Sequence, residues 1–389
     1  MRRAGALRIA VVGGGLGGTV AAIMLHRAGH DVALYEQAPE IARIGAGINL
    51  SPNVTRVIRA LGLEGPLTTT GLLPDRFDQR DWDTGRFTYV LRYDQFPERY
   101  GAPHVILHRG DLQQVLNSAL APGVLRLGKR LADLDETAGG MRLSFADGTT
   151  ADADIVIGAD GINSRVREIL IGEEQPVYTG HVAHRAIYPA SLLNGLRVAD
   201  ASKWWAEDRY FMAYYLTPKR DEMYLVTGVP MDWPSDEFSP APISVDQFRD
   251  AFAGFHPEVQ TLIAACPSVL AWPVLYRAPY PLWSRGRIVL LGDACHPMKP
   301  HMGQGAAMAM EDAAMLARCI EHGRGDDPAK AFALYESLRF DRTTRVKVTS
   351  DGHEWMRHGS DGDWLYGYDV FAVPLEPPQS AAAPALASA

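Results

Sequence analysis

The N-terminal segment alternates between apolar runs and a glycine-rich turn. Residues 7–12 are mostly apolar and lead into the turn, residues 19–28 have a helical pattern, and residues 31–35 are apolar again. A strand, a turn, a helix and a second strand in this order predict a βαβ unit of about 30 residues.

A turn signal marks a second group of strands. Asp147 and Gly148 stand between the apolar segments 141–145 and 153–157, and this Asp-Gly pair predicts a β-hairpin. Residues 155–158 form an apolar run that ends in a glycine, which predicts a buried strand.

Aromatic and β-branched residues dominate the stretch from about residue 176 to residue 275. Within it, residues 209–216 suit a half-buried strand of an antiparallel sheet. Apolar residues return at 287–291 as a buried strand, and residues 305–320 follow as an Ala- and Met-rich helix packed on all sides. The middle stretch therefore predicts a second domain inserted into the first.

These elements predict an α/β fold in which a Rossmann-like domain and an antiparallel β-sheet domain interleave along the chain. We expect residues 1–175 and 276–368 to form the Rossmann-like domain. We expect residues 176–275 to form the β-sheet domain, joined by part of residues 70–107. Residues 370–389 are a low-complexity tail that we expect to be disordered.

Composition and charge argue against several classes of function. The 389 residues include 38 basic and 46 acidic side chains, for a formal net charge of -8, whereas nucleic-acid binding calls for a basic surface. No apolar stretch approaches the ~18 residues of a membrane-spanning helix. Cys266, Cys295 and Cys319 make neither a disulfide framework nor a zinc-like spacing. We therefore expect a cytoplasmic monomer or homodimer that binds no metal, nucleic acid or membrane.

The glycine turn has the spacing G-x-G-x-x-G. The first glycine of such a turn permits the tight bend, the second lets the backbone approach a pyrophosphate, and the third lets helix and strand pack closely. An acidic residue after the second strand is suited to bind a ribose diol. The motif indicates a dinucleotide site without distinguishing FAD from NAD, and its predicted contacts are Gly13, Gly15, Leu16, Gly18, Glu36 and Gln37.

Two further motifs resemble the fingerprints of the single-component FAD-dependent aromatic hydroxylases, the family typified by para-hydroxybenzoate hydroxylase. They are Gly-Ala-Asp-Gly at residues 158–161 and Gly-Asp-Ala-Cys-His-Pro at residues 292–297. The resemblance implies that Asp293 binds the ribityl chain of FAD, that Asp160 contacts FAD and the nicotinamide cofactor, and that Arg109 lies along the flavin. A helix beginning after residue 302 would offer donors to the flavin ring, from Gly303, Gly305 and Ala306.

A closer resemblance covers about residues 8–368 and is to the branch of this family that acts on 6-hydroxynicotinate. It is carried by segments such as Trp-Trp-Ala-Glu-Asp-Arg at 204–209 and Lys-Pro-His-Met at 299–302. The resemblance implies that Tyr214 and His301 hydrogen-bond the substrate near the flavin, and we place Gly47 in the cofactor site. A histidine so placed can hold or deprotonate a substrate hydroxyl.

The sequence departs from this branch at three positions of the expected pocket. Asn49 and Tyr210 stand where the branch has histidines, and Ala201 stands where it has a cysteine. We expect Asn49 and Tyr210 to contact the substrate, and the altered hydrogen-bonding groups to change which ring substituents bind. The substrates para-hydroxybenzoate, salicylate and para-nitrophenol therefore stay open beside 6-hydroxynicotinate.

The resemblance also implies a reaction. NADH, or NADPH, would reduce FAD, and O2 would form a C4a-hydroperoxide whose electrophilic oxygen attacks an electron-rich carbon of a small aromatic or pyridine substrate. A carboxylate on that carbon would leave as CO2, so that 6-hydroxynicotinate would become 2,5-dihydroxypyridine. Two other interpretations fit less well: an isoprenoid reductase needs an apolar tunnel, and a flavin or dinucleotide sensor needs an output segment.

Overall fold

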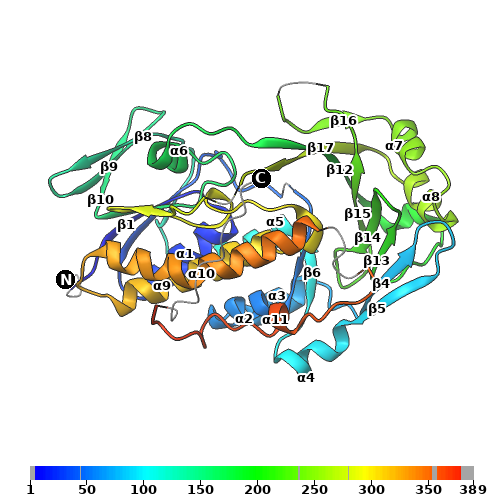
Figure 1. Ribbon diagram of the computed structural model, residues 1–389, viewed down its shortest axis with the longest axis horizontal. Coiled ribbons are helices and arrows are strands. Elements are labelled where there is room, and N and C mark those ends of the chain that lie inside the picture. The colour runs from blue at the N-terminus through cyan, green and yellow to red at the C-terminus, as the bar shows by residue number, and fades with distance from the viewer. Residues whose placement is uncertain (1–4, 44, 235–236, 279, 353–356, 378–389) are drawn as a thin grey trace, which may run out of the picture.

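The computed structural model describes residues 5–43, 45–234, 237–278, 280–352 and 357–377. The chain is built around two large β-sheets that lie side by side along its long axis (Figure 1). One sheet has six strands and the other has eight. The α/β fold expected from the sequence is confirmed. None of the described helices has the length and apolar character that a membrane span requires.

The six-stranded sheet contains the predicted βαβ unit. Strand β1 pairs in parallel with both β2 and β11, so that Val11 lies between Leu34 and Ile157. The central strands are apolar because both faces of a parallel sheet are covered. The strand order is β18 (Ser284–Arg285), β19 (Ile288–Leu290), β11 (Ile155–Gly158), β1 (Arg8–Val12), β2 (Asp31–Tyr35) and β7 (Leu125–Arg126).

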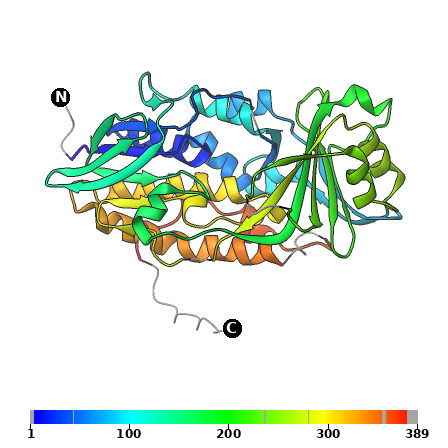
Figure 2. The same cartoon turned by 90° about the horizontal axis from the view of Figure 1, so that it is seen from above.

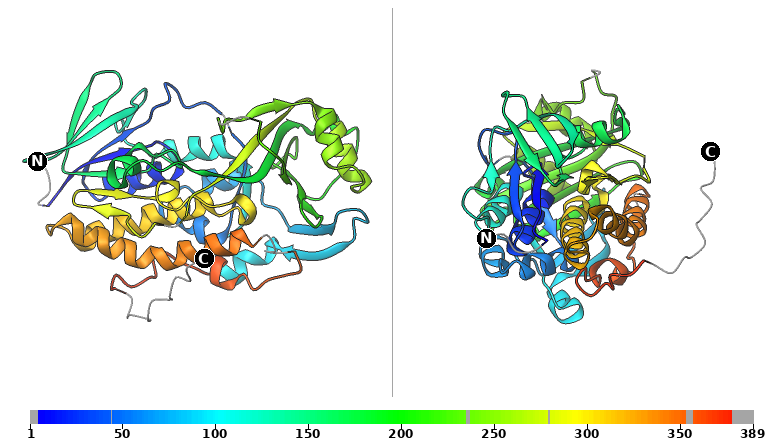
Figure 3. Two further views of the ribbon diagram at one scale, coloured as in Figure 1. Left: turned by 45° about the horizontal axis from the view of Figure 1, so that its top comes forward. Right: turned by 90° about the vertical axis from the view of Figure 1, so that its left-hand side faces the viewer.

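Three helices pack together beside this sheet. They are α1 (Leu16–Arg27), α9 (Gly305–His322) and α10 (Pro328–Asp351), and the two long ones run along the molecule, coloured orange in Figure 3. Helix α9 is the predicted Ala- and Met-rich helix. It can approach α1 closely because a Cβ built on Gly17 would lie only 3.0 Å from Ala309.

The predicted hairpin forms with a shorter second arm. Strand β9 (Gly140–Phe145) pairs with β10 (Thr150–Ala153), and the apolar residues that follow belong instead to β11 of the parallel sheet.

The remaining elements of this half are β8 (Leu131–Thr137), the pair β3 (Gly47–Leu50) and β6 (Val105–His108), and helices α2 (Pro52–Ala60), α3 (Glu64–Thr70), α4 (Phe96–Tyr100), α5 (Arg109–Asn117), α6 (Arg165–Ile171) and α11 (Asp363–Tyr366).

The eight-stranded sheet stands at the opposite end of the molecule (Figure 2). Strands β4 and β13 pair in parallel, whereas the other pairings in this sheet are antiparallel. The strand order is β16 (Ala241–Ile243), β17 (Val269–Tyr276), β12 (Val177–Pro189), β15 (Glu222–Pro230), β14 (Tyr210–Tyr215), β13 (Ala201–Trp205), β4 (Arg76–Asp81) and β5 (Phe87–Arg92).

The two faces of this sheet have different neighbours. Phe211 of β14 packs on the aromatic rings of Phe248 and Phe252, which belong to the helical layer of α7 (Val245–Ala251) and α8 (Pro257–Ala264). Because side chains alternate along a strand, Tyr210 and Met212 point to the other face. That face is turned toward the six-stranded half of the molecule.

The structure describes residues 370–377, which the composition had assigned to the disordered tail. Val370 is fully buried, and its carbonyl and that of Val373 accept hydrogen bonds from Arg318. The buried side chain of Val370 and the two hydrogen bonds from Arg318 hold this segment against the rest of the protein. The rest of the tail, residues 378–389, lies outside the described residues.

A buried network of charges joins α9 to α10. The guanidinium of Arg339 donates to Glu311 at 2.7 Å and to Asp312 at 2.6 Å, and all three side chains have no exposed surface. Arg342 also donates to Glu311, as does Asn53 of α2. Burial alone would raise the pKa of Asp312, but His296 and Arg339 outweigh it and lower the pKa to about 2. This carboxylate therefore stabilises the fold above about pH 4 and loses that effect as the pH falls toward 2.

Replacing Arg339 with Met should lower the free energy of unfolding by about 3–5 kcal/mol, because two buried carboxylates lose their cation. Urea denaturation followed by circular dichroism measures this change. The control is Arg59→Met, which removes a partly exposed ion pair with Glu64 and should cost less than about 1 kcal/mol. Equal effects of the two substitutions would contradict the importance of the buried network.

Candidate active site

Two glycines of the G-x-G-x-x-G turn are required by the packing of the chain itself. Gly13 has a φ of +106°, and a Cβ on it would lie 2.3 Å from the carbonyl oxygen of Ala159. A Cβ on Gly18 would lie 2.0 Å from the carbonyl oxygen of Gly13. Any larger side chain at these two positions would push β1, α1 and the end of β11 apart.

Gly15 differs from its neighbours because nothing in the protein crowds it. A Cβ on Gly15 would meet only the Arg109 guanidinium, at 4.0 Å. Gly15 is the N-cap of α1, and no side chain caps this end of the helix. Free backbone N–H groups and the helix dipole favour an anion here, and the absence of a side chain leaves room for it. This is the arrangement that a pyrophosphate requires.

Glu36 lies next to the turn, at the end of β2. Its two carboxylate oxygens accept hydrogen bonds from the backbone N–H groups of Gly14 and Ala38, each at 2.8 Å. The side chain is therefore held in one orientation by the backbone, which sequence reasoning did not anticipate. Each oxygen keeps a second lone pair, so the carboxylate can still accept from a ribose hydroxyl. The adjacent Gln37 is exposed.

Asp160 lies beside the glycine turn but is directed to a different partner. Its carboxylate accepts hydrogen bonds from the Ser164 hydroxyl and from the backbone N–H of Val166, at the start of α6. A Cβ on Gly13 would lie 2.8 Å from the Asp160 Cα, so the backbone borders the site. The described contacts of the Asp160 side chain organise the helix start, and its contact with a cofactor stays a prediction.

Asp293 lies in the segment that links β19 to α9. Burial raises the pKa of this carboxyl, while His296, Arg109 and Lys347 act to lower it. A Cβ on Gly305, the first residue of α9, would lie 3.9 Å from Asp293 Oδ1. Arg109 lies over Gly15 and Gly45. A glycine turn at one end, a buried carboxylate and a helix start at the other, and an arginine between them fit an extended dinucleotide such as FAD.

The residues near the start of α9 differ in the contacts that surround them. Gly303 has a φ of +65°, which favours glycine, and a Cβ there would meet nothing within 4 Å. Gln304 is fixed by its side chain, which donates to Ser51 and accepts from Asn53. Ala306 follows in the first turn of α9. Donors at this helix start are suited to an anionic ring.

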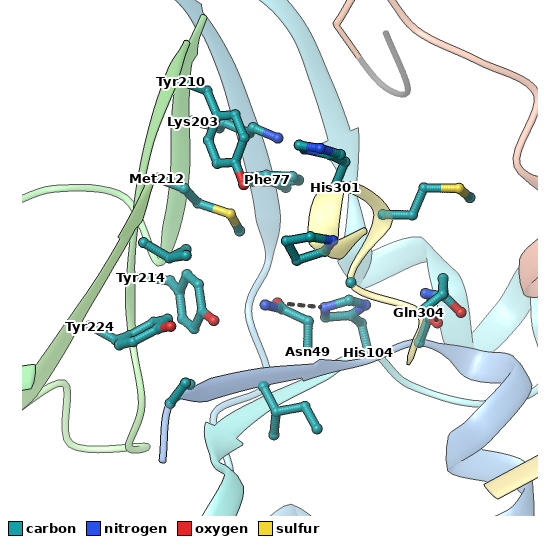
Figure 4. Close-up of a pocket in the computed structure, with 18 of the residues that line it drawn as sticks. Asn49, Phe77, His104, Lys203, Tyr210, Met212, Tyr214, Tyr224, His301 and Gln304 are labelled. Carbon is teal, nitrogen blue, oxygen red and sulfur yellow. Dashed lines mark hydrogen bonds between the residues drawn. The ribbon is translucent and has the colours of Figure 1, made fainter. Parts of the chain in front are cut away.

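A cavity of about 180 Å³ lies between the eight-stranded sheet and the loop before α9. Tyr210 and Tyr214 of β14 line it, as does His301 from the loop (Figure 4). Tyr210 and His301 meet edge to face, with ring centroids 5.8 Å apart. The structure thus brings together side chains that lie about 90 positions apart in the sequence.

The tyrosines of the cavity are buried and stay protonated. Burial raises the pKa of Tyr214 and Tyr210, with Tyr224 adding to the effect, and it raises the pKa of Tyr224 to about 12. Each phenol can therefore donate a hydrogen bond over the ordinary pH range. Gly47 is needed for this wall, because a Cβ there would lie 2.5 Å from the Tyr214 ring.

The altered position Asn49 is paired with a histidine that sequence reasoning missed. Asn49 Oδ1 lies 3.2 Å from His104 Nε2, and the His104 ring stacks on Tyr93 at a centroid distance of 3.8 Å. Burial lowers the pKa of His104 to about 3, so the ring is neutral and can donate to Asn49. Of the two other altered positions, Tyr210 lines the cavity, and Ala201 is fully buried opposite Tyr214 in the sheet.

Four polar side chains of the cavity, His104 among them, were not predicted. The cavity is lined by His104, which directly precedes β6, by Gln79 of β4, by Lys203 of β13 and by Arg185 of β12. The strand pairings that bring them together are long-range, so spacing along the chain carries no signal of them. Among the lining residues, all of which the structure describes, none is Asp or Glu.

The sequence matches the family model described as FAD binding domain over residues 6–252 and 270–349. The chain belongs to this family. The 6-hydroxynicotinate 3-monooxygenase of Bordetella bronchiseptica is 52% identical over 97% of this chain and 99% of its own length. The one of Pseudomonas fluorescens is 48% identical over 97% and 98%.

Solved structures agree with this family. Klebsiella pneumoniae HpxO complexed with FAD and uric acid superposes with a TM-score of 0.79 at 28% identity, covering 91% of this chain and 90% of that one. A salicylate hydroxylase substrate complex superposes with a TM-score of 0.81 at 27% identity, covering 95% and 97%. The chain is an FAD-dependent aromatic monooxygenase with NAD(P)H as its electron donor, as the resemblance implied.

Replacing Gly15 with Ala should weaken FAD binding by about tenfold or more, because the added methyl group enters the space left for the pyrophosphate. Quenching of FAD fluorescence by the apoprotein measures the affinity, and the melting temperature of the apoprotein should not change. Gly65→Ala in α3, where a Cβ meets nothing within 4 Å, is the control. Wild-type FAD affinity in the Gly15 variant would contradict this placement of the cofactor.

Proposed function

We propose that this monooxygenase hydroxylates 6-hydroxynicotinate to 2,5-dihydroxypyridine, with NADH as the donor and loss of the carboxylate as CO2. Two relatives of 52% and 48% identity bear the name of this activity and align over nearly the whole chain, which supports a shared substrate. One atom of O2 enters the ring at the carbon that loses the carboxylate, and the other leaves as water.

The observation that carries the proposal is the presence of Tyr214 and His301 on the walls of one small cavity. These are the two residues that the resemblance assigns to substrate binding. At about 180 Å³ the cavity is smaller than the ~300–1,000 Å³ typical of sites for drug-sized ligands, and it suits one substituted ring.

The charge of the lining supports an acidic substrate. Lys203 and Arg185 bring two basic groups to the cavity, and its lining residues include no carboxylate. Field lines concentrate in a narrow site with walls of low dielectric, so an aromatic acid is attracted and a cation is repelled.

The residues of the chain would bind and orient the ring. Bound FAD, once reduced, supplies the chemistry that activates O2 toward an aromatic carbon. Tyr214 donates a hydrogen bond to the ring oxygen, and His301, on the loop that carries Asp293, holds the substrate from the other end of the cavity. The aromatic wall of Tyr210, Tyr214 and Tyr224 excludes water, which strengthens each of these polar contacts.

A second candidate keeps the chemistry and changes the ring. Asn49, held by neutral His104, and Tyr210 give the cavity hydrogen-bonding groups that differ from those of the 6-hydroxynicotinate branch. This observation favours para-hydroxybenzoate, salicylate or para-nitrophenol as the alternative. The 3-amino-4-hydroxybenzoate 2-monooxygenase of Streptomyces cremeus, 37% identical over 87% of this chain, bears the name of such a benzoate activity.

We also propose that the chain divides into two domains. One comprises residues 1–175 and 276–368, and the other comprises residues 176–275 with part of 70–107. The two large sheets support this division. Cys266, Cys295 and Cys319 are buried and free, which supports a place in the reducing cytoplasm. A monomer or a homodimer is expected, and size-exclusion chromatography with light scattering distinguishes the two.

The purified enzyme should oxidise NADH fastest with 6-hydroxynicotinate when it is offered a panel of hydroxylated aromatic acids and phenols. Substrate loss, NADH loss and product are measured together by absorbance and chromatography. Release of 2,5-dihydroxypyridine confirms the proposal. Higher kcat/KM with one of the benzene substrates would favour the second candidate.

Tyr214→Phe and His301→Ala should each lower kcat/KM for hydroxylation by about 100-fold, since each removes a group that positions the substrate. The matched control is Tyr215→Phe, because Tyr215 is the next residue of β14 and its side chain points to the other face of the sheet. Steady-state kinetics with product analysis compares the three variants. If Tyr215→Phe were as damaging as Tyr214→Phe, the assigned role of Tyr214 would be wrong.

A further inference from the structure

A row of side chains crosses five strands of the eight-stranded sheet and faces the cavity. Strand register places Lys203 opposite Gln79 on one side and Met212 on the other, and then Val226 and Arg185. All five residues line the cavity. The row therefore begins with an amide and an ammonium group and ends with a guanidinium group.

Lys203 is buried without an opposite charge. The side chain is 4% exposed, and Nζ lies 3.7 Å and 3.8 Å from the ring centroids of Trp205 and Tyr210. Within the part of the chain that the structure describes, no carboxylate forms an ion pair with it. Burial lowers the pKa of Lys203 well below its usual value. A buried ammonium group is costly unless an anion or a hydrogen-bond acceptor meets it.

Gln79 places a second donor beside Lys203. The indole Nε1 of Trp205 lies 2.5 Å from Gln79 Oε1 and can only donate, so the amide oxygen must face Trp205. The amide nitrogen is then the other end of the side chain. Gln79 has no exposed surface, and its Nε2 is buried without a hydrogen-bond partner among the described residues.

We propose that Lys203 Nζ and Gln79 Nε2 together bind the carboxylate of the aromatic substrate. This inference rests on the proposed function, because it requires the substrate to be an aromatic acid. A carboxylate has two acceptor oxygens and one negative charge, which match two neighbouring donors of which one is a cation. Its binding would satisfy two buried groups for which the described residues provide no acceptor.

The geometry favours this pair over Arg185. Arg185 stands three strands away in the row, which is about 14 Å at the usual strand spacing. Its guanidinium carbon lies 4.7 Å from the centroid of the Trp272 ring. Figure 4 shows Lys203 and His301 at one end of the cavity and Tyr214 with Asn49 at the other. A ring held by its carboxylate at Lys203 would direct the opposite substituent, the ring hydroxyl, toward Tyr214.

The test compares two ligands that differ only in the carboxylate. The oxidised holoenzyme is titrated with 6-hydroxynicotinate and with 2-hydroxypyridine, and the change in flavin absorbance gives each Kd. Lys203→Met should weaken 6-hydroxynicotinate by about 30-fold or more and 2-hydroxypyridine by less than about threefold. Lys203→Arg should restore most of the difference. FAD content and melting temperature show whether each variant is folded.

Two more variants sharpen the result. Gln79→Glu keeps the acceptor for Trp205 but places an anion beside Lys203, so it should weaken 6-hydroxynicotinate by about tenfold or more and spare 2-hydroxypyridine. Arg185→Met should change the ratio of the two Kd values far less than Lys203→Met does, because Arg185 acts on the acid only through the field of the cavity. Equal weakening of both ligands by Lys203→Met, or loss of the carboxylate effect in Arg185→Met instead, would overturn the proposal.

The wild-type enzyme separates this inference from the function on which it rests. If wild-type enzyme neither binds nor hydroxylates 6-hydroxynicotinate, the proposed substrate is wrong. The same comparison is then made with the aromatic acid that the enzyme does hydroxylate and with the phenol that lacks its carboxylate. If wild-type enzyme hydroxylates 6-hydroxynicotinate and Lys203→Met binds it normally, only the assignment of the carboxylate site fails.

Discussion

The buried carboxylate of Asp312 organises the segment on which both halves of the site depend. It accepts hydrogen bonds from the backbone of Gly292, from His296 and from Arg339. A charge without exposed surface is stable only with such partners. Through these contacts α9 and α10 hold the loop that carries Asp293 at its start and His301 near its end. The position of Asp293, which is predicted to bind FAD, and the position of His301, which is proposed to bind the substrate, are therefore set by one ionic network.

The two sheets contribute different parts of the same active site. The six-stranded sheet ends in a glycine turn that is closed by packing at Gly13 and Gly18 and open at Gly15. The eight-stranded sheet presents a polar face that is neutral at Tyr214 and basic at Lys203 and Arg185. The first is suited to a dinucleotide and the second to an aromatic acid. Reduction of a flavin and oxygenation of a ring require that both ligands meet, and the loop before α9 carries both Asp293 and His301.

The sequence predicted best what depends on local spacing. The glycine turn, the βαβ unit and α9 follow from short-range patterns, and Asp293, Tyr214 and His301 from motifs that resemble a known family. Short-range patterns could not reveal that Glu36 is held by backbone N–H groups.

The polar wall around Lys203 escaped prediction for a different reason. Gln79 and Lys203 are neighbours only because β4 pairs in parallel with β13, 124 positions later in the chain. The adjacent Trp204 and Trp205 favour a core strand when the sequence is considered alone. His104 becomes part of the site through the pairing of β3 with β6, which brings it to Asn49. Register in a sheet is a tertiary property, and no periodicity within one strand encodes it.

With FAD bound between these elements, the chain would hold an aromatic acid so that one atom of O2 enters its ring. Turnover of 6-hydroxynicotinate with NADH under isotopically labelled O2, followed by mass spectrometry of the product, tests it most directly. We expect one labelled oxygen atom in 2,5-dihydroxypyridine, with one NADH consumed and one CO2 released for each product. A product whose new hydroxyl carries unlabelled oxygen from water, or NADH oxidation without any change in the aromatic acid, would contradict it.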